Sequence, residues 1–349
     1  MERYSFYLWS DSLIDTMSAK KKLLFSFSLL FILWIIVAVI SVFSGTYEIN
    51  PIKAIFSGDE ISRTIYFQIR VPRVLMAAVA GGVLAISGAS LQALFRNPLA
   101  CPFTLGVSGG ASLGALIAIR LGLAETLIGF SSIEIFAFVF SILTIFFVYS
   151  VSKVRGVVST GRLLLAGVVA NFLYSALVLF IQFFSDFTQS LQTVRWIMGS
   201  LDVVGFDTIW KTLIFAAPGC LILFSITKNM NLFALGDDVA SSLGVDVNRM
   251  EKTIYFATSL AASAVISATG PIGFVGLIIP HVLRMIIGVD NRILIPCSFL
   301  LGASFLTAAD TVSRTILSPV EIPVGIITAS CGGVFFLWLL MRMKKEVIV

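Results

Sequence analysis

Charge is scarce in this 349-residue chain. Only 12% of its residues are Asp, Glu, Lys or Arg, whereas 58% are hydrophobic and the mean hydropathy is +1.01. A soluble domain usually carries about 25% charged residues, so too few polar side chains are present to cover a water-facing globule of this size. The composition excludes an ordinary soluble domain and predicts an all-α, polytopic membrane protein.

Metal-ligating and catalytic side chains are also few. The chain has one histidine, His281, and four cysteines without metal-like spacing: Cys101, Cys220, Cys297 and Cys331. We interpret the cysteines as small packing residues and the histidine, which has no acidic neighbour in sequence, as structural rather than haem-ligating. We therefore expect no metal site, no cofactor and no catalytic residues, because an intramembrane enzyme would need a paired acid and base or a metal cluster.

Signals for an energy source within the chain are missing as well. The P-loop pattern GxxxxGK[ST] is absent, so the chain cannot bind ATP through a P-loop of its own. No predicted span has a carboxylate at its centre; Asp310 and Glu321 lie near span ends. Because ion-driven carriers usually bury ionisable groups at mid-membrane, an ion-coupled secondary carrier is the weaker alternative. The net charge of +5 is scattered and does not indicate nucleic-acid binding.

What the chain does have is a series of long apolar segments. About 20 apolar residues cross a bilayer as a helix, and that length predicts about ten transmembrane helices in a single permease domain, 1–349. The first apolar run follows Lys20, Lys21 and Lys22 and is too long for a signal-peptide core. The predicted spans are roughly 23–43, 72–94, 103–121, 133–152, 162–184, 206–227, 252–269, 273–288, 293–310 and 323–342.

The basic residues predict the orientation. An even number of spans places both termini on one side. With the N-terminus inside, the inner segments hold 16 Lys and Arg and the outer segments hold 8, which together make the 24 of the chain. Cytoplasmic loops carry an excess of Lys and Arg, so we expect both termini, including a tail 1–22, to be cytoplasmic.

The longest inner loop, about 228–251, is a candidate partner surface. Asn231 and Asp237–Asp238 are possible helix N-caps, and Gly244 is a possible helix stop. We expect two short helices at the cytoplasmic face. An ordinary connector is the alternative reading.

Small residues recur every four positions in several spans. Close backbone approach through small residues drives helix association in lipid, so these stripes predict a tightly packed bundle. They are Ala77, Gly81, Ala85 and Ala89; Gly106, Gly110 and Gly114; and Gly325, Ala329 and Gly333.

Six motifs in order resemble one family, the permease subunits of binding-protein-dependent ABC importers for iron complexes, haem and cobalamin (FecCD-like, type II importers). The motifs are RVPRVLMAAVAGGVLAISGASLQALFRNPLACPFTLGVSGGASLGA (70–115), STGRLLLAGV (159–168), RWIMGSL (195–201), NLFALGDD (231–238), GPIGFVGLIIPHVLR (270–284) and ADTVSRTILSPVEIPVGIITA (309–329).

This resemblance implies an ABC type II importer permease fold with ten spans, in a bacterial or archaeal cytoplasmic membrane. It implies as partners a second permease copy (a homodimer or a close heterodimer), two ATPase subunits that bind ATP and Mg²⁺, an extracytoplasmic substrate-binding protein, and membrane lipid. The permease itself would be a transport subunit and not an enzyme.

The resemblance also assigns residues. On the outer face, arginines would grip carboxylates of the binding protein, with snorkelling to headgroups as the alternative: Arg70, Arg73 and Arg314. At the inner end, small residues would form a cytoplasmic gate: Ser159, Thr160 and Gly161. The long inner loop would dock the ATPase through Leu235, Gly236, Asp237, Asp238 and Gly244, with simple helix capping as an equal alternative for the two aspartates.

The segment GPIGFVGLIIPHVLR concentrates helix breakers in a predicted span. Gly270 and Pro271 would end one helix, Gly273 and Gly276 would let the next pack tightly, and Pro280 would remove a backbone hydrogen bond and kink it. With Gly106, Gly110 and Gly114, these residues are expected to act as packing and hinge elements of a protein that alternates between two shapes.

The sequence therefore predicts the permease of an ATP-driven importer. We expect its cargo to be a ferric siderophore, with cobalamin or haem as alternatives within the same family.

Overall fold

The computed structural model describes residues 19–45, 60–123, 126–127, 129–154 and 157–346. Most of the predicted tail 1–22 lies outside these ranges. The described chain is helical apart from two short antiparallel hairpins, β1 (Thr126–Leu127) with β2 (Phe130–Ser131) and β3 (Lys153–Val154) with β4 (Val157–Val158). The predicted all-α class is confirmed.

Every predicted span coincides with a helix. The long elements are α1 (Ala19–Phe43), α4 (Val71–Phe95), α5 (Val107–Arg120), α6 (Ser132–Ser152), α7 (Thr160–Phe183), α9 (Asp207–Ser225), α12 (Val247–Thr269), α13 (Val275–Ile287), α14 (Asn291–Thr315) and α15 (Val324–Glu346). Shorter elements are α3 (Glu60–Thr64), the π-helix η1 (Ile65–Arg70), the 3₁₀ turn η2 (Pro102–Leu105), α8 (Phe187–Ile197), α10 (Thr227–Phe233) and α11 (Asp237–Ser242).

Not all ten helices are full-length spans. Within the described residues, seven are long and apolar enough to cross a membrane, whereas α5 and α13 are shorter apolar helices of 14 and 13 residues. Helix α12 is long enough, with 23 residues, but is not among the seven. At 1.5 Å per residue these two are only about 20 Å long. Buried irregular chain precedes each of them, with Cys101 and Ile272 almost inaccessible. Irregular backbone is tolerated at membrane depth when protein surrounds it, so ten uniform spans of about 20 residues was too simple a prediction.

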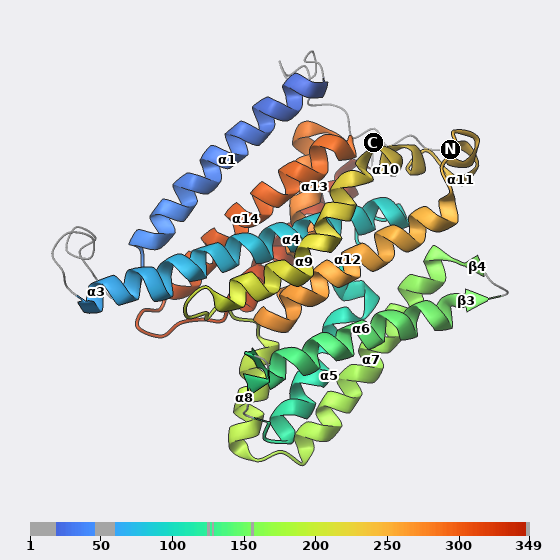
Figure 1. The fold of residues 1–349 in the computed structure, drawn as a ribbon. Coiled ribbons are helices and arrows are strands. Elements are labelled where there is room, and N and C mark those ends of the chain that lie inside the picture. Colours follow the sequence, from blue (N-terminus) through green and yellow to red (C-terminus); the bar gives the residue numbers. More distant parts are fainter. Residues whose placement is uncertain (1–18, 46–59, 124–125, 128, 155–156, 347–349) are drawn as a thin grey trace.

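Helices α4 and α14 form the centre of the bundle. These two helices pack along one another (Figure 1). Helix α1 covers α14, and α13 lies against both α4 and α14. Helices α9 and α12 pack beside α4. A second group, α5, α6 and α7, joins the first through contacts of α12 with α6 and α5. Helix α4 is buried over nearly all of its length, whereas α1 and α7 expose most of their apolar side chains.

The small-residue stripes explain the tight centre. Ala77, Ala85 and Ala89 are fully inaccessible, and a Cβ at Gly81 would strike the backbone carbonyl of Gly302 on α14. Gly110 and Gly114 give the same close approach between α5 and α6. The third stripe is confirmed only in part: a Cβ at Gly325 would strike the carbonyl of Met198, whereas a Cβ at Gly333 would meet nothing within 4 Å, and Gly332 packs against Phe274.

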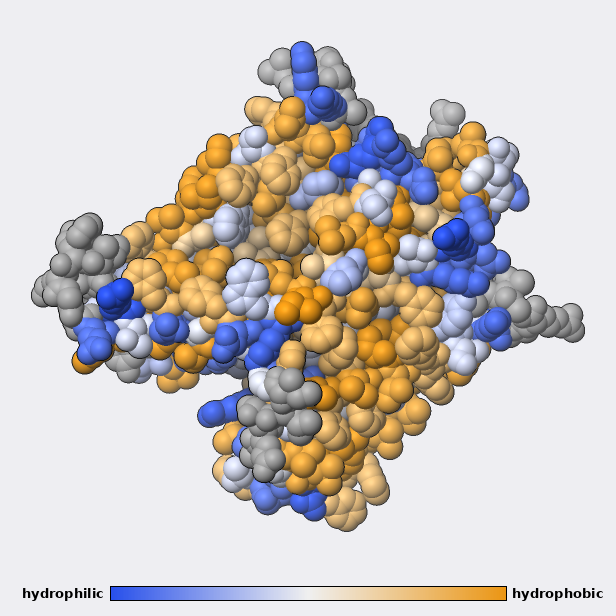
Figure 2. All heavy atoms as spheres, viewed as in Figure 1, coloured by the Kyte–Doolittle hydropathy of each residue, from blue (hydrophilic) through white to orange (hydrophobic). Residues whose placement is uncertain are grey.

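The surface separates into apolar and polar regions. Apolar residues cover the middle of the face in Figure 2, and hydrophilic residues gather near α3, near α8 and around α10 and α11. Such a surface, with its apolar helices, is that of a multi-pass membrane protein.

Candidate functional site

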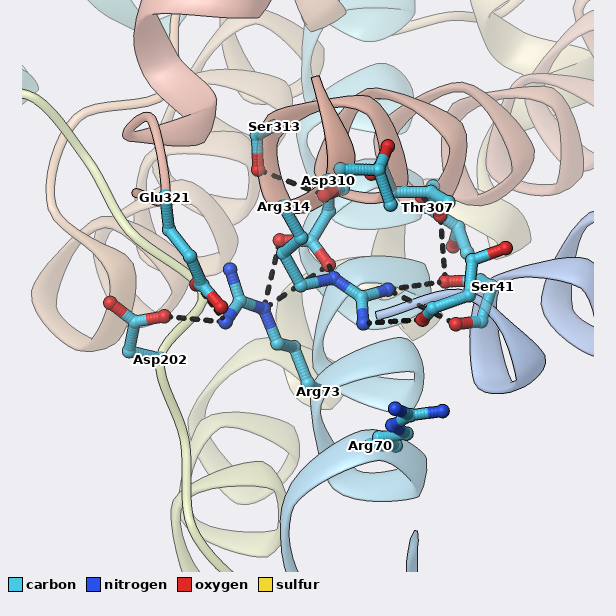
Figure 3. A network of polar contacts seen from close by, with 12 residues as sticks. Ser41, Arg70, Arg73, Asp202, Thr307, Asp310, Ser313, Arg314 and Glu321 are labelled. Carbon is cyan, nitrogen blue, oxygen red and sulfur yellow. Dashed lines mark hydrogen bonds and ion pairs between the residues drawn. The ribbon is translucent and has the colours of Figure 1, made fainter. Parts of the chain in front are cut away.

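A cluster of charged side chains lies where α4 begins and α14 ends (Figure 3). We call Arg73, Asp202, Asp310, Arg314 and Glu321 the charged cluster. Arg73 comes from the first turn of α4, Asp310 and Arg314 from the last turns of α14, and Asp202 and Glu321 from the loops that follow α8 and α14. The cluster therefore joins three regions that are far apart in sequence: the start of α4, the loop after α8, and the end of α14 with the loop that follows it.

Arg73 is the centre of the cluster. Its Nε donates to both carboxylate oxygens of Asp310, at 3.0 and 3.2 Å, and its Nη1 lies 2.8 Å from Asp202 Oδ1 and 2.7 Å from Glu321 Oε2. Asp310 is completely inaccessible, whereas the side chains of Asp202 and Glu321 are 66% and 37% exposed. One guanidinium thus holds one buried and two exposed carboxylates.

Arg314 shares the buried carboxylate. Its Nε lies 3.0 Å from Asp310 Oδ2, one helical turn earlier, and its terminal nitrogens donate to Ser41 and to the carbonyl of Ser44 at the end of α1. Arg70 also reaches α1, donating to the carbonyls of Val42 and Phe43. Buried charges need partners, and here those partners bind α1, α4 and α14 together at one end of the bundle.

The three predicted docking arginines therefore share one end of the molecule, but not in the expected manner. Arg70, Arg73 and Arg314 are all buried, and their guanidinium groups meet partners within the chain. Side chains placed in this way do not snorkel toward headgroups. Contact with a binding protein stays a prediction for all three.

Sequence reasoning missed the acidic half of the cluster. Asp310 stands four residues before Arg314, a spacing that pairs opposite charges on a helix, so this partner could have been found. Nothing in the sequence places Asp202 beside Arg73, because that contact depends on how the loop after α8 folds.

The predicted ATPase-coupling loop lies at the other end of α4. It forms two short helices as predicted, α10 and α11, separated by Gly236 in a left-handed backbone conformation (φ +118°). Leu235, Val239 and Leu243 are exposed at four-residue intervals. Asp238 is exposed, and Gly244 follows the end of α11 with φ +84°. The loop therefore presents an apolar stripe with an acidic edge.

Arg96 ties this loop to α4. It follows the last residue of α4 in a left-handed conformation, and its Nη2 donates to Asp237 Oδ1 at 2.5 Å and to the carbonyl of Phe233 at 2.8 Å. Its guanidinium also lies over the ring of Phe233. Asp237 thus has a partner within the chain, which neither of its two predicted roles included.

A second contact joins the loop to α14. Asn231 lies inside α10, not at its N-cap as predicted, because α10 already begins at Thr227. Its amide donates to Asp290 Oδ1 at 2.6 Å and accepts from the backbone N–H of Asn291. Hydrogen bonds from Arg292, and then from Asn231, lower the pKa of Asp290 to about 2 against the opposing effect of desolvation.

Asp290→Asn tests this contact through pH. Because the folded-state pKa is below the usual value of about 3.9, the charged Asp290 contributes stability above about pH 4, and the contribution is lost as pH falls toward 2. Since the group is partly exposed, the effect is small. Thermal unfolding in detergent between pH 2 and 6 should show that the variant loses less stability on acidification than the wild type does. The same loss of stability at low pH in the variant and the wild type would contradict the assignment.

The predicted gate residues lie where α7 begins. Ser159 is the N-cap of α7, and Thr160 and Gly161 are its first two residues. Ser159 and Gly161 are exposed and Thr160 is partly so. Small, accessible side chains are present at this end, and gating by them stays a prediction.

The hinge and packing residues have several distinct environments. Gly270 ends α12 at φ +68°, where a Cβ would strike the carbonyl of Trp196, and the carbonyl of Pro271 packs on Gly199. Gly273 is not closely packed, since its nearest neighbour, Phe103, lies 3.8 Å from a built Cβ. Gly276 instead makes the close approach.

Pro280 does not interrupt its helix. Helix α13 runs through it from Val275 to Ile287. The predicted helix end at Gly270 and Pro271 is confirmed, since α12 ends at Thr269 and α13 begins at Val275. His281 packs its ring against Phe335 and Phe336 of α15.

Metal-binding groups do not gather in the described residues: no three His, Cys, Asp or Glu side chains there could hold a metal ion. Cys101, Cys220 and Cys297 are buried, as expected of packing residues, whereas Cys331 is exposed.

The helix bundle, with polar contacts at both ends, defines a multi-pass membrane permease. A model of the FecCD transport family matches residues 32–342, and the chain belongs to this family of ABC importer permeases. It is 39% identical over 284 residues to the hemin transport system permease protein HmuU of Yersinia pestis, covering 81% of this chain and 84% of that protein. It is 39% identical over 285 residues to the cobalamin import system permease protein BtuC of Halobacterium salinarum, covering 82% and 75%.

The fold has a solved counterpart. A structure described as an inward-facing conformation of a metal-chelate type ABC transporter matches with a TM-score of 0.80 and 32% identity, covering 92% of this chain and 99% of that one. The predicted type II importer permease fold is confirmed.

Proposed function

We propose that this permease carries a ferric siderophore inward across the cytoplasmic membrane of a bacterium or archaeon. It works as a homodimer with two ATPase subunits that bind ATP and Mg²⁺ and hydrolyse the ATP, and with a substrate-binding protein that docks outside. Both termini are cytoplasmic, so the charged cluster faces outward and the α10–α11 loop faces the ATPases.

One observation carries this proposal: the two predicted docking regions lie at opposite ends of the same helix. Arg73 and Arg96 are separated by nearly the whole of α4, which at 1.5 Å per residue is about 35 Å and exceeds the roughly 30 Å hydrocarbon core. A partner at each face could therefore act on one continuous helix.

The described residues also favour a cargo that arrives already chelated. They contain no cluster able to strip or hold a bare metal ion. A wrapped iron complex would instead contact the apolar and small side chains that dominate this chain.

Haem and cobalamin are the second candidates. Relatives of similar identity are named for hemin and for cobalamin, and either cargo also keeps its metal inside an organic ligand.

Uptake by reconstituted vesicles distinguishes these cargoes. The permease is assembled with a cognate ATPase and binding protein, with ATP enclosed, and offered radiolabelled iron as a hydroxamate or catecholate siderophore, haem, or cobalamin. We expect ATP-dependent accumulation of an iron siderophore. Accumulation of haem or cobalamin alone would contradict the siderophore assignment and leave the family unaffected.

A further inference from the structure

The charged cluster contains three carboxylates for its two arginines. Arg73 and Arg314 share the inaccessible Asp310, and that triad alone carries one net positive charge. Asp202 and Glu321 bring two further carboxylates to Nη1 of Arg73 from the accessible side. In Figure 3 they approach the guanidinium from the side opposite Ser41 and α1.

The two exposed carboxylates sit on loops that are joined to one another. Asp202 lies in the loop after α8, where the Ser200 N–H donates to the carbonyl of Thr269 at 2.8 Å. Glu321 lies in the loop before α15, and the N–H of Gly325, just inside α15, donates to the carbonyl of Gly199. Arg73 therefore connects the loop after α8 with the loop before α15, close to the end of α12.

The contact of Arg73 with Asp310 and its contacts with Asp202 and Glu321 differ in how easily they break. Asp310 is fully buried between Arg73 and Arg314, so Arg73 cannot leave it without weakening the pairing of a buried charge, which is costly. The carboxylates of Asp202 and Glu321 are 66% and 37% exposed, and a pair that water can reach is weak, so either carboxylate can leave Nη1 and be solvated. An acidic side chain from outside could then take their place with similar geometry.

We propose that Asp202 and Glu321 are placeholder carboxylates, which occupy Arg73 while no partner is bound and yield it to acidic side chains of the docking protein. This inference rests on the proposed docking at this face. The placeholders neutralise the arginine in the undocked permease. Their departure removes the contacts between Arg73 and the two loops, so docking itself loosens the junction of α8, α12 and α15.

The placeholders lower the affinity for the partner. Only molecules with Arg73 accessible are competent to bind, and the apparent affinity falls by that fraction. Removing both negative charges while keeping side-chain size should therefore tighten docking. Since one exposed pair contributes up to about fivefold, we expect the dissociation constant of Asp202→Asn/Glu321→Gln to fall by about five- to tenfold.

The test is a binding titration. The permease, assembled with its ATPase in lipid nanodiscs, is titrated with its fluorescently labelled cognate binding protein. Asp207→Asn is the matched control, because Asp207 is an exposed carboxylate on the neighbouring helix terminus, five residues after Asp202. It removes a charge from the same face without touching Arg73, and we expect its affinity to stay at the wild-type value.

Each outcome decides the question. A gain confined to the double variant supports the placeholder role. An unchanged or weaker affinity in a folded double variant overturns it, as does an equal gain per charge in Asp207→Asn, which would show only long-range repulsion. If the wild-type permease does not bind the protein at all, the proposed docking face is wrong, a failure distinct from that of the placeholders.

Discussion

Asp310→Ala is expected to destabilise the permease by about 3–5 kcal/mol, the usual cost of breaking a buried ion pair by removing one partner. The substitution leaves Arg73 and Arg314 buried without the carboxylate they share. It also releases the end of α14 from α4. Thermal unfolding in detergent, followed by intrinsic fluorescence, measures the loss.

Glu321→Ala is the matched control for this prediction. It removes a carboxylate from the same arginine at a similar distance, but from an exposed position, so we expect a loss of only about 0–1 kcal/mol. Equal losses for the two variants would show that burial does not set the strength of the cluster.

Gly88→Ala should give the second large effect, a net loss of stability from one added methyl group. A Cβ at Gly88 would strike the carbonyl and Cα of Gly276 on α13, and backbone atoms cannot rotate away. We expect an overpacking cost of about 3 kcal/mol, which exceeds the roughly 1 kcal/mol that alanine gains over glycine in a helix. The fraction of monodisperse protein after heating reports the outcome.

Gly333→Ala should change stability in the opposite direction. The position is also inside a helix, but a Cβ there meets nothing within 4 Å, so only the gain in helix propensity remains. If both variants were as stable as the wild type, the close contact between α4 and α13 would be contradicted.

The sequence was sufficient for the helices because their signal is local. Runs of apolar residues near 20 in length identified every long helix, since a bilayer demands that length. The same rule overestimated α5 and α13, because the chain just before each of them is irregular yet buried, at 100–101 and at 270–274, where Gly270 and Ile272 are buried. Their clusters of proline and glycine were visible in the sequence, but the burial that permits an irregular path was not.

The polar contacts were predictable only where they are local. Asp310 and Arg314 stand one turn apart on one helix. Arg73 and Asp202, or Arg96 and Asp237, come together only through tertiary packing, and a single sequence gives no measure of such distances. Contacts of this kind explain why buried arginines that were expected to face a partner also have partners within the chain.

We propose that partner subunits supply the energy for transport by this permease. Purified permease should be placed in vesicles twice, alone with a proton or sodium gradient, and together with its ATPase and binding protein plus enclosed ATP, and the uptake of the chelated cargo compared. We predict accumulation only in the complete, ATP-containing vesicles. Uphill uptake by the permease alone, driven by the ion gradient, would contradict the account.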